Sequence, residues 1–505
     1  MDETLREEIR AARAAATSSG GPGHPDAGAG PVDDAGRMSA RNRVLALADA
    51  RSFIEYGALA GRTSAPDDPH VADGLVCGVA EVDGLPVAIA ATDRSVLDGT
   101  QSARNQRKLA RLLQVVQRER WPLVLFLDGD GARPGEPLPA PPVMVAPLGR
   151  WGLYDGLAEL NGWAPTIACI AGQVLDGEAG AAFLCDVVLA TASSRIGARD
   201  DHGTIVTRGA DEHAKRGDVD LVLGSDGEAI AAIRHCLSFH AADRAAGEPS
   251  PTHAGIADIV PENRRSPYDM RRLIAAFADR DSVLELAPGY GRSMLTVLAR
   301  LAGRTIGIFA NQPKSPLAGS IDPDAADKAA RFIDLCDAYG FPLVSFVDNP
   351  GYMVGPQSEA AGMARHHARP LAALHHRSVP LCSVQVRKAY GLGPYAMSGW
   401  GVSRNAPLLK LAWPSVESGG MSLEGAAYLV LRKEIAAAAT PAEGLAIRNA
   451  YAERMRDSTS GIRAGRSFQF DDIVDPLDTR AIIAAMLNRI PRQRPAQRRH
   501  AIDPR

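Results

Sequence analysis

The sequence has few of the features that mark secreted, membrane-spanning or nucleic-acid-binding proteins. Its six cysteines are scattered and form no Cys-x-x-Cys pair, which argues against a disulfide or zinc framework. No apolar run approaches the roughly 20 residues that a membrane span needs, and residues 1–15 are charged rather than signal-like. The formal net charge of -3 favours neither nucleic acid nor membrane as a partner. We therefore expect a cytoplasmic protein with neither partner.

The common catalytic motifs are also missing. Gly-x-Ser-x-Gly, His-Glu-x-x-His and Walker A patterns do not occur. Four histidines fall on one helical stretch but have no carboxylate or thiolate partner at ligand spacing, so solvated or core histidines are favoured over a metal site; these are His366, His367, His375 and His376. Chemistry that depends on backbone electrostatics is the remaining expectation.

What the sequence does contain is enough apolar material for several cores. The chain has 505 residues, of which 46% are hydrophobic and 23% charged, and this length suggests two to four domains. A helix is predicted over residues 3–16, a flexible Gly- and Pro-rich linker over 18–31, and renewed order near Ser39. Residues 491–505 are rich in Arg and Pro, which predicts a solvated terminus rather than a nucleic-acid-binding tail.

The region between these ends repeats itself. Each half has a short strand, two strands joined by a glycine-containing turn, a helix that leads into an apolar strand, and another apolar strand that runs into a glycine turn and a helix. Continuous apolar strands are typical of sheets covered on both faces. The runs of the first half are 52–57, 75–80, 86–90, 121–128 and 165–170, and those of the second are 282–287, 294–298, 305–309, 341–348 and 379–384. The boundary falls near 261–267.

The informative positions are those where an apolar strand meets glycine and then a helix. Backbone N–H groups at such a place can bind a developing oxyanion without an acidic side chain. The best candidate is the segment 386–398, where Gly391 and Gly393 permit close backbone approach and a helix starts at or after Pro394. The segment 348–353 is a second turn at a strand end. Two glycines before a helix can also be a turn and nothing more.

The same segments carry a family resemblance. Ordered motifs occur at 310–313, 328–332, 342–351, 387–391, 411–414, 421–425 and 432–434. Together they resemble the carboxyltransferase (beta) subunit of biotin-dependent acyl-CoA carboxylases, of the propionyl- and acetyl-CoA carboxylase type, and related decarboxylases. The resemblance covers essentially all of residues 267–487 and is looser over 39–238.

The resemblance implies an α/β fold of two tandem crotonase-like (ClpP/crotonase) domains built of ββα units. It divides the chain into an N-terminal helix and linker (1–38), an acyl-CoA-side domain (39–260), a biotin-side domain (261–490) and a basic tail (491–505). The implied reaction moves a carboxyl group from carboxybiotin to the α-carbon of an acyl-CoA, with the biotin anion as base and two backbone oxyanion holes. The chain has no Ala-Met-Lys-Met tetrapeptide, so biotin would arrive on a separate carrier protein.

The implied partners are an acyl-CoA and a biotin carboxylase/biotin carboxyl carrier subunit, and the implied assembly is a homo- or hetero-hexamer. On the biotin side, the oxyanion hole maps onto Gly391, Leu392 and Gly393, where the family usually has Gly-Gly-Ala. Tyr395 stands where the family carries a residue linked to acyl-chain size, and Gly351 is a further substrate-binding position.

On the acyl-CoA side, the oxyanion-hole position maps onto Asp176 and Gly177. The implied substrate-binding residues of this half are Asp98, Gly99, Gly131 and Ala132. The first glycine of a family pair is replaced by aspartate at three loops, at positions 98, 130 and 176. Two interpretations remain: each Asp-Gly is an ordinary turn with its carboxylate in solvent, or the carboxylates converge on the thioester and the site is lost or repurposed.

Two other functions remain beside the carboxyltransferase. The chain could be a catalytically weak paralogue that assembles or regulates an active subunit, or a biotin-linked acyl-CoA decarboxylase that runs the reverse reaction. The sequence identifies neither the acceptor nor the direction.

Overall fold

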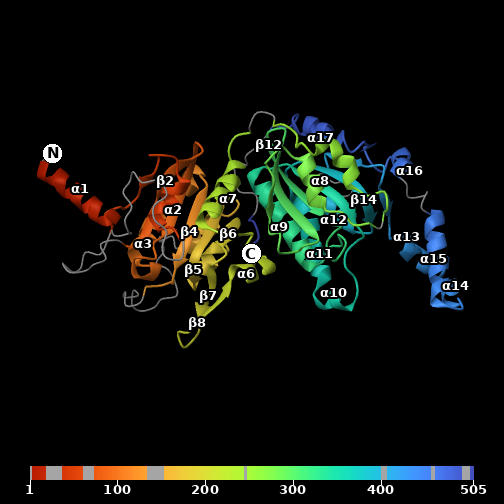
Figure 1. Cartoon of the computed structure of the whole chain (residues 1–505), viewed down its shortest axis with the longest axis horizontal. Helices are drawn as coiled ribbons and strands as arrows, with labels where there is room; N and C mark the ends of the chain where they lie inside the picture. The colour runs from red at the N-terminus through yellow and green to blue at the C-terminus, as the bar shows by residue number, and fades with distance from the viewer. Residues whose placement is uncertain are drawn as a thin grey trace. The chain divides into compact units, whose positions relative to one another are not determined.

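The structure is a computed structural model that describes residues 3–18, 37–60, 73–133, 153–243, 247–264, 266–399, 406–455, 461–491 and 501–504. Its contacts divide the chain into two compact units, Met1–Ala241 with Gln497–Arg505 and Ala242–Ala496. Each unit has its own sheet and its own helices (Figure 1). The linker expected over 18–31 lies, from residue 19 on, outside the described residues.

The predicted N-terminal helix is confirmed as α1 (Glu3–Ser18). The order predicted near Ser39 is present as α2 (Ala40–Leu47), which the side chain of Ser39 caps by accepting the hydrogen bond of the Asn42 N–H.

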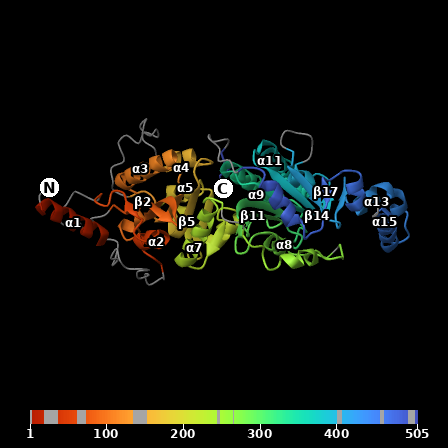
Figure 2. The ribbon, with the colours of Figure 1, turned by 90° about the horizontal axis from the view of Figure 1, so that it is seen from above.

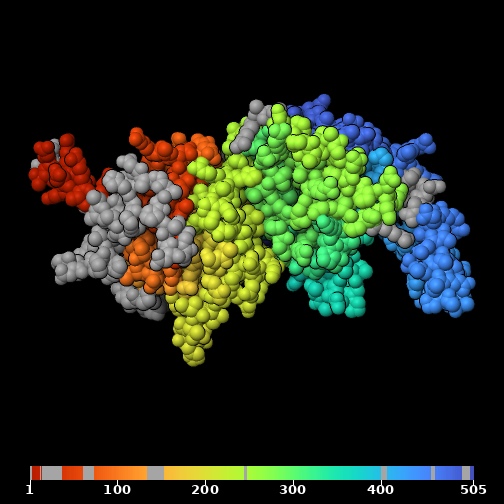
Figure 3. Space-filling model, in the orientation of Figure 1, coloured from red at the N-terminus to blue at the C-terminus, as the bar shows by residue number. Residues whose placement is uncertain are grey.

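The sheet of the first unit is mixed. Its order is β1-β2-β3-β4-β5-β6-β9, and β7 pairs with both β5 and β8. The pairs β1/β2, β2/β3 and β7/β8 are antiparallel, whereas β3 to β6 and β9 are parallel. The β7–β8 hairpin protrudes from the surface of this unit (Figure 3). The strands are β1 (Ile54–Glu55), β2 (Leu75–Val82), β3 (Leu85–Thr92), β4 (Leu123–Gly129), β5 (Thr166–Leu175), β6 (Val187–Thr191), β7 (Arg195–Arg199), β8 (Ile205–Gly209) and β9 (Leu221–Leu223).

Helices cover both faces of this sheet. The helices α3 (Ala103–Glu119) and α4 (Leu153–Leu160) lie on one face, and α2 and α7 (Asp226–Ser238) lie on the other (Figure 2). Leu112, Leu113 and Val116 of α3 pack in one apolar core with Leu123 and Leu125 of β4. Shorter elements follow individual strands: η1 (Leu97–Gly99), α5 (Gly177–Ala182) and α6 (Ala210–Arg216).

The second unit repeats this plan. Its sheet has the order β10-β11-β12-β13-β14-β15-β17, with β16 paired to β14. The first two pairs are antiparallel and the others are parallel. The strands are β10 (Leu284–Leu286), β11 (Met294–Leu301), β12 (Arg304–Asn311), β13 (Leu343–Asn349), β14 (Leu381–Tyr390), β15 (Leu409–Ala412), β16 (Glu417–Gly419) and β17 (Asp472–Ile473).

Here α11 (Met363–His376) and α8 (Met270–Phe277) lie on opposite faces of the sheet (Figure 2). Helix α9 (Pro323–Tyr339) packs beside α11, and α17 (Thr479–Leu487) shares the core of α8, in which the Phe277 and Phe346 rings meet edge to face at 5.1 Å. No helix within the described ranges is both long and apolar enough to cross a bilayer. The remaining helices are η2 (His253–Ile259), α10 (Pro356–Ala360), α12 (Gly393–Ser398), α13 (Leu423–Val430), α14 (Arg432–Ala436), α15 (Pro441–Met455) and α16 (Gly461–Arg466).

The predicted α/β class and the predicted repeat are confirmed. The order β2-β3-α3-β4-β5-α5 in the first unit matches β11-β12-α9-β13-β14-α12 in the second. The registers also match, since Leu123 pairs with Thr166 as Leu343 pairs with Leu381. Matching positions of the two units can therefore be compared residue by residue.

The expectation of a solvated terminus is wrong for Ile502, whereas residues 501, 503 and 504 are exposed as expected. Ile502 is fully buried, and its backbone N–H and C=O form hydrogen bonds of 2.6 and 3.0 Å with the side-chain amide of Asn161. Because an amide side chain can accept and donate at once, Asn161 satisfies both backbone groups of Ile502.

Candidate functional site

The loops that follow β3 and β12 come equally close to the central strand of their sheets. A Cβ atom on Gly99 would lie 2.5 Å from the backbone oxygen of Asp128, and one on Gly319 would lie 2.6 Å from that of Asp348. Both glycines also have a positive φ, of 66° and 85°. Glycine is required at the predicted position 99 because no side chain fits between loop and strand.

The loops after β4 and β13 join these first loops in the same way in both units. The Gln101 N–H donates to the carbonyl of Gly131 at 2.7 Å, and the Ile321 N–H donates to that of Gly351 at 3.1 Å. In the first unit a parallel bridge links Gln101 to Ala132. The structure therefore brings the predicted residues of loops 98–99 and 131–132 side by side at the carboxyl ends of β3 and β4.

The turns after β5 and β14 are the third matching pair. The Asp176 N–H donates to Gly197 O at 2.9 Å, and the Gly391 N–H donates to Gly419 O at 3.0 Å. Their φ angles are 54° and 65°. Asp176 combines its φ with a ψ of -126°, a conformation that suits glycine and costs other residues on the order of 1–3 kcal/mol.

Asp176 and Asp130 are held by one arginine of β7. The Arg199 N–H donates to Asp176 Oδ1 at 2.8 Å, and Arg199 Nη1 donates to Asp176 Oδ2 at 2.6 Å. The same Nη1 donates to the backbone oxygen of Asp130 at 2.7 Å, and Nη2 lies 3.9 Å from Asp130 Oδ2. Arg199 therefore connects two of the three substituted loops.

A second arginine, Arg94, follows β3 and pairs with Asp130 at 2.9 Å. Although burial lowers the pKa of Arg94, the hydrogen bond that Arg94 donates to Asp130 and the negative charges of Asp130, Asp128 and Asp98 raise it overall. Asp98 itself is exposed at the tip of its loop.

Asp98 fits the interpretation of a solvent-facing turn, whereas the other two substituted loops fit neither interpretation. Asp130 and Asp176 are neither plain solvent-facing turn residues nor an unpaired cluster, because two guanidinium groups neutralise them. The sequence did not reveal this, since Arg94 and Arg199 lie outside the three substituted motifs.

Beneath the loops, each unit buries an aspartate at the end of its central strand, but with a different counter-charge. In the second unit, Arg387 Nε bonds to Asp348 Oδ2 at 2.9 Å, and both side chains are at most 2% exposed. In the first unit the position that matches Arg387 is Gly172, where a Cβ would lie 2.1 Å from Asp128 Oδ1. A large side chain therefore cannot stand at position 172.

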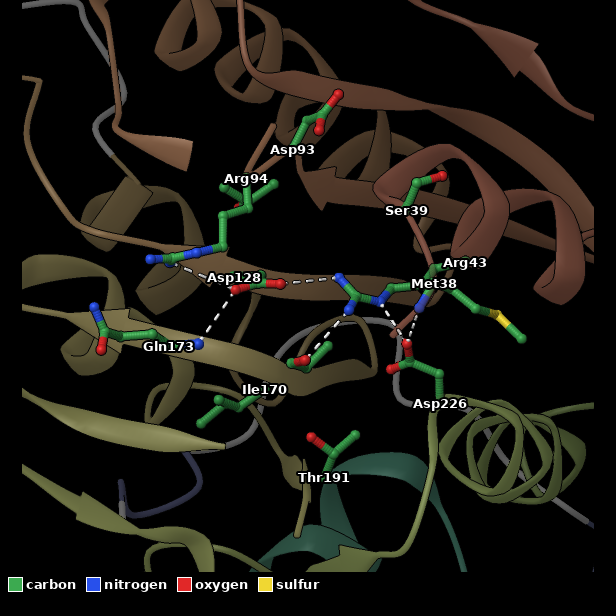
Figure 4. A network of polar contacts seen from close by, with 12 residues as sticks. Met38, Ser39, Arg43, Asp93, Arg94, Asp128, Ile170, Gln173, Thr191 and Asp226 are labelled. Atoms are coloured by element: carbon green, nitrogen blue, oxygen red, sulfur yellow. Dashed lines mark hydrogen bonds and ion pairs between the residues drawn. The ribbon is translucent and has the colours of Figure 1, made fainter. Parts of the chain in front are cut away.

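Arg43 of α2 takes over this role in the first unit (Figure 4). Its guanidinium lies 3.4 Å from Asp128 Oδ2 and 3.2 Å from Asp226 Oδ2, and donates to the Ala171 carbonyl at 3.2 Å. The Arg43 side chain is only 2% exposed. The central strand of each unit thus ends in a buried, neutralised carboxylate that fixes the neighbouring loops.

Sequence reasoning also missed Glu178, in the first turn of α5. Its side chain is 1% exposed, and Thr92 Oγ1 donates to its Oε1 at 2.7 Å. Its Oε2 has no hydrogen-bond partner within the part of the chain that the structure describes. Burial raises the pKa of Glu178 to about 7. One charged residue in an otherwise small-residue helix directly after a buried strand was the available signal.

The predicted residue Gly177 is exposed beside a tyrosine. Tyr154 Oη of α4 donates to the Gly177 carbonyl at 2.5 Å, and a Cβ on Gly180 would lie 2.8 Å from the same hydroxyl. Tyr154 therefore packs against the glycines of α5, and larger residues at position 180 would displace it.

On the other predicted turn, Gly391 is half-buried, Leu392 is 57% exposed and Gly393 is buried. A Cβ on Gly393 would lie 2.3 Å from Asn349 Oδ1, so glycine is needed there too. Asn349 Oδ1 accepts the N–H of Gly351, whereas its buried Nδ2 has no partner among the described residues. The structure thus brings Gly351 and the 391–393 turn together around one amide. Tyr395 lies in the first turn of α12 and is 37% exposed.

The four histidines lie on α11, as the sequence suggests. His366 has a carboxylate partner that spacing along the helix did not reveal, because its Nδ1 lies 2.9 Å from Asp327 Oδ1 of α9. Across the described ranges, no three His, Cys, Asp or Glu side chains gather as a metal-binding group.

Comparison with known proteins agrees with this geometry. The carboxyl transferase domain family matches residues 31–502. The chain is 34% identical to the methylmalonyl-CoA carboxyltransferase 12S subunit of Propionibacterium freudenreichii subsp. shermanii, over 90% of this chain and 88% of that protein. It is 32% identical to the beta4 subunit of the biotin-dependent long chain acyl-coenzyme A carboxylase of Mycobacterium tuberculosis, over 89% and 88%.

Among solved structures, a crystal structure of transcarboxylase 12S, with methylmalonyl-coenzyme A and methylmalonic acid bound, aligns with a TM-score of 0.81 and 30% identity. The alignment covers 99% of this chain and 98% of that one. The chain therefore belongs to the carboxyl transferase domain family and has its crotonase-like fold. It is a carboxyltransferase enzyme, and these relatives do not favour an assembly-only role or a decarboxylase.

Proposed function

We propose that this chain transfers a carboxyl group from carboxybiotin, carried on a separate protein, to the α-carbon of an acyl-CoA. Residues 39–260 would bind the acyl-CoA and residues 261–490 would receive the biotin. The observation that carries the proposal is the matched geometry of three loops in each unit, above all the anchored turns at Asp176 and Gly391. Both relatives named above have names that specify carboxyl transfer to or from acyl-CoA thioesters.

On the acyl-CoA side, the site consists of the loops at Asp98–Gly99, Gly131–Ala132 and Asp176–Gly177. Main-chain N–H groups that are rigidly held can stabilise the negative charge of a thioester enolate, because they need no reorganisation as the charge develops. The pairing of Asp130 and Asp176 with arginines removes the objection that bare carboxylates would repel this charge.

On the biotin side, the residues present fit a ureido group. Gly391 and Gly393 add no side chains to the turn, and Asn349 places beside it an amide donor that has no partner among the described residues. The ureido ring of biotin would lie against the turn of Gly391, Leu392 and Gly393 and against Gly351, with Tyr395 at the edge of this site. Biotin supplies the transferable carboxyl group when it is bound; the protein orients it and excludes water.

The direct test uses free biotin as the acceptor in the reverse direction. The purified chain is incubated with biotin and either methylmalonyl-CoA or malonyl-CoA, and the decarboxylated CoA product is measured by chromatography. We expect product formation that depends on biotin. A folded protein that forms no product with either thioester, and none with a biotinylated carrier, would contradict the proposal.

We also propose that the chain works as a hexamer with a biotin carboxylase/biotin carboxyl carrier partner in the cytoplasm. Transcarboxylase 12S, which this chain matches over nearly its full length, forms a hexamer assembly. All six cysteines are free and buried, which suits a reducing compartment. Mass photometry should give six times the 53.3 kDa chain mass. A biotinylated polypeptide should co-purify from the native source; a monomer without such a partner contradicts this assembly.

A further inference from the structure

The carboxyl group of Glu178 lies where three elements of the first unit end or begin. Thr92 is the last residue of β3 and donates to Glu178 Oε1. Gly129 is the last residue of β4, and a Cβ there would lie 2.6 Å from Glu178 Oε2. The glutamate itself is in the first turn of α5, directly after the Asp176–Gly177 turn. The carboxyl ends of parallel strands are where α/β proteins place their chemistry.

This carboxyl group lines a pocket on the α3 face of the sheet. The pocket is mostly apolar, with walls that include Leu109, Leu125 and Leu153, and its polar lining includes Gln101. The Glu178 side chain is 1% exposed, and one of its oxygens has no partner among the described residues, which is costly unless a ligand or water meets it. The small volume of the pocket, about 30 Å³, limits a ligand beside this carboxyl to a short acyl group.

The second unit has no equivalent group. Because Asp176 matches Gly391, Glu178 matches Gly393, which has no side chain. The carboxyl therefore belongs to the proposed acyl-CoA side alone and is not required by the repeated fold.

We propose that Glu178 is a catalytic base that removes the α-proton of an acyl thioester bound in this pocket. The inference depends on the proposed function, because it concerns the acyl-CoA of that reaction. The α-C–H bond breaks, the proton passes to Glu178 Oε2, and the electron pair moves into the thioester as an enolate. The proton then leaves Glu178 for water, and the enolate is consumed by carboxylation or by reprotonation. The family resemblance assigned this role to the biotin anion; here the protein carries its own base.

The surroundings of Glu178 bring its pKa close to neutral pH. Burial is the largest cause and raises the pKa of Glu178; the Thr92 hydrogen bond lowers it, and the negative charges of Asp128 and Asp130 raise it further. The resulting pKa of about 7 is suited to a general base near neutral pH.

The test is exchange of the α-hydrogens of propionyl-CoA with deuterium oxide, without biotin or carrier, followed by mass spectrometry. The unaltered protein should incorporate deuterium at a rate that rises with pH through about 7 and then levels. Glu178→Gln should lower this rate about 100-fold or more. Glu119→Gln, a surface carboxylate of α3, should leave it unchanged. Carboxyl transfer to free biotin is measured in parallel.

The outcomes are distinguishable. Exchange that needs biotin, or that survives in Glu178→Gln, overturns the proposal even where carboxyl transfer is normal. Exchange without any carboxyl transfer supports the base and overturns the proposed function instead. If Glu178→Gln does not fold, Thr92→Val serves, because loss of the donor should move the midpoint of the pH–rate profile upward, whereas Thr92→Ser should restore it. An unmoved midpoint in Thr92→Val contradicts the proposal.

Discussion

Arg199 holds Asp176 with its main chain and its side chain at the same time, through bonds of 2.8 and 2.6 Å to the two carboxylate oxygens. The carboxylate is thereby fixed from the neighbouring strand, and the aspartate keeps a positive φ, which its counterpart Gly391 adopts without strain. Asp176 departs from the family pattern, but its two bonds to Arg199 also stabilise this turn; we call this Arg199–Asp176 pair the clamp.

The clamp predicts strong coupling between the two residues. Arg199→Ala should destabilise the protein and weaken acyl-CoA-dependent turnover, because it leaves Asp176 and Asp130 short of a counter-charge. Asp176→Gly loses the ion pair but relieves the positive φ. The double variant should therefore lose less free energy of unfolding than the two single variants lose together. We expect a difference of about 0.5–3 kcal/mol in urea unfolding. Arg208→Ala, on the same hairpin as Arg199, breaks an exposed pair with Glu212 of α6 and should cost under about 1 kcal/mol. Additive effects of the two site variants would contradict the clamp.

The buried network of Arg43 predicts a large difference between two arginines of one helix. Arg43→Leu leaves Asp128 and Asp226 buried with the main counter-charge removed, which typically costs about 3–5 kcal/mol. Arg41→Leu breaks a more accessible pair with Glu55 and should cost about 1 kcal/mol. Urea unfolding of both variants checks this, and equal losses would show that the buried network contributes little.

The biotin-side turn predicts a selective loss of function. Gly393→Ala places a methyl group against Asn349, so either the turn or the amide must shift. Transfer to free biotin should fall at least about tenfold, whereas α-hydrogen exchange of propionyl-CoA, which uses the other unit, should be retained. Gly255→Ala adds the same methyl group in open space and should change neither rate. Parallel loss of both activities in Gly393→Ala would indicate general misfolding and contradict the assignment.

Glu178 predicts a pH-dependent stability. Its folded pKa of about 7 lies above the usual 4.5, so between these values the folded protein binds a proton that the unfolded chain has lost. Its contribution to stability therefore falls as pH rises through this window, by roughly 3 kcal/mol in total. Glu178→Gln avoids the loss, so its stability relative to the unaltered protein should improve between about pH 5 and pH 8. Urea unfolding at both values measures the change, with Glu119→Gln as a pH-independent control. If the stability difference between Glu178→Gln and the unaltered protein is the same at both pH values, folding does not raise the pKa of Glu178 and this prediction is wrong.

The sequence was sufficient for the repeat because the central strands of both sheets, such as β4 and β13, are mostly apolar runs in the same order. Close approach accounts for the glycines at 99 and 393, where a Cβ would lie 2.5 Å from Asp128 O and 2.3 Å from Asn349 Oδ1. Positions 131 and 391 have a positive φ, of 77° and 65°, which glycine adopts without strain. The pairing of Arg43 with Asp128 could not be found, since the two residues are 85 positions apart and no local pattern relates them. Arg94, Arg199 and Glu178 acquire their roles only through tertiary contacts. The burial of Ile502 likewise depends on one amide, Asn161, far away in the sequence.

The guanidinium group that neutralises the buried aspartate comes from α2 in the first unit and from β14 in the second. The matching strands of the two units are therefore not freely exchangeable. A chimera that moved β14 into the first unit would bring Arg387 into a space already filled by the Arg43 guanidinium and place two cations on Asp128. The reverse transplant would bring Gly172 opposite Asp348 and leave that carboxylate buried with no cation. The two halves share one architecture, but each neutralises its buried aspartate with an arginine from a different element. Exchanging strands between the halves is therefore expected to yield unstable proteins.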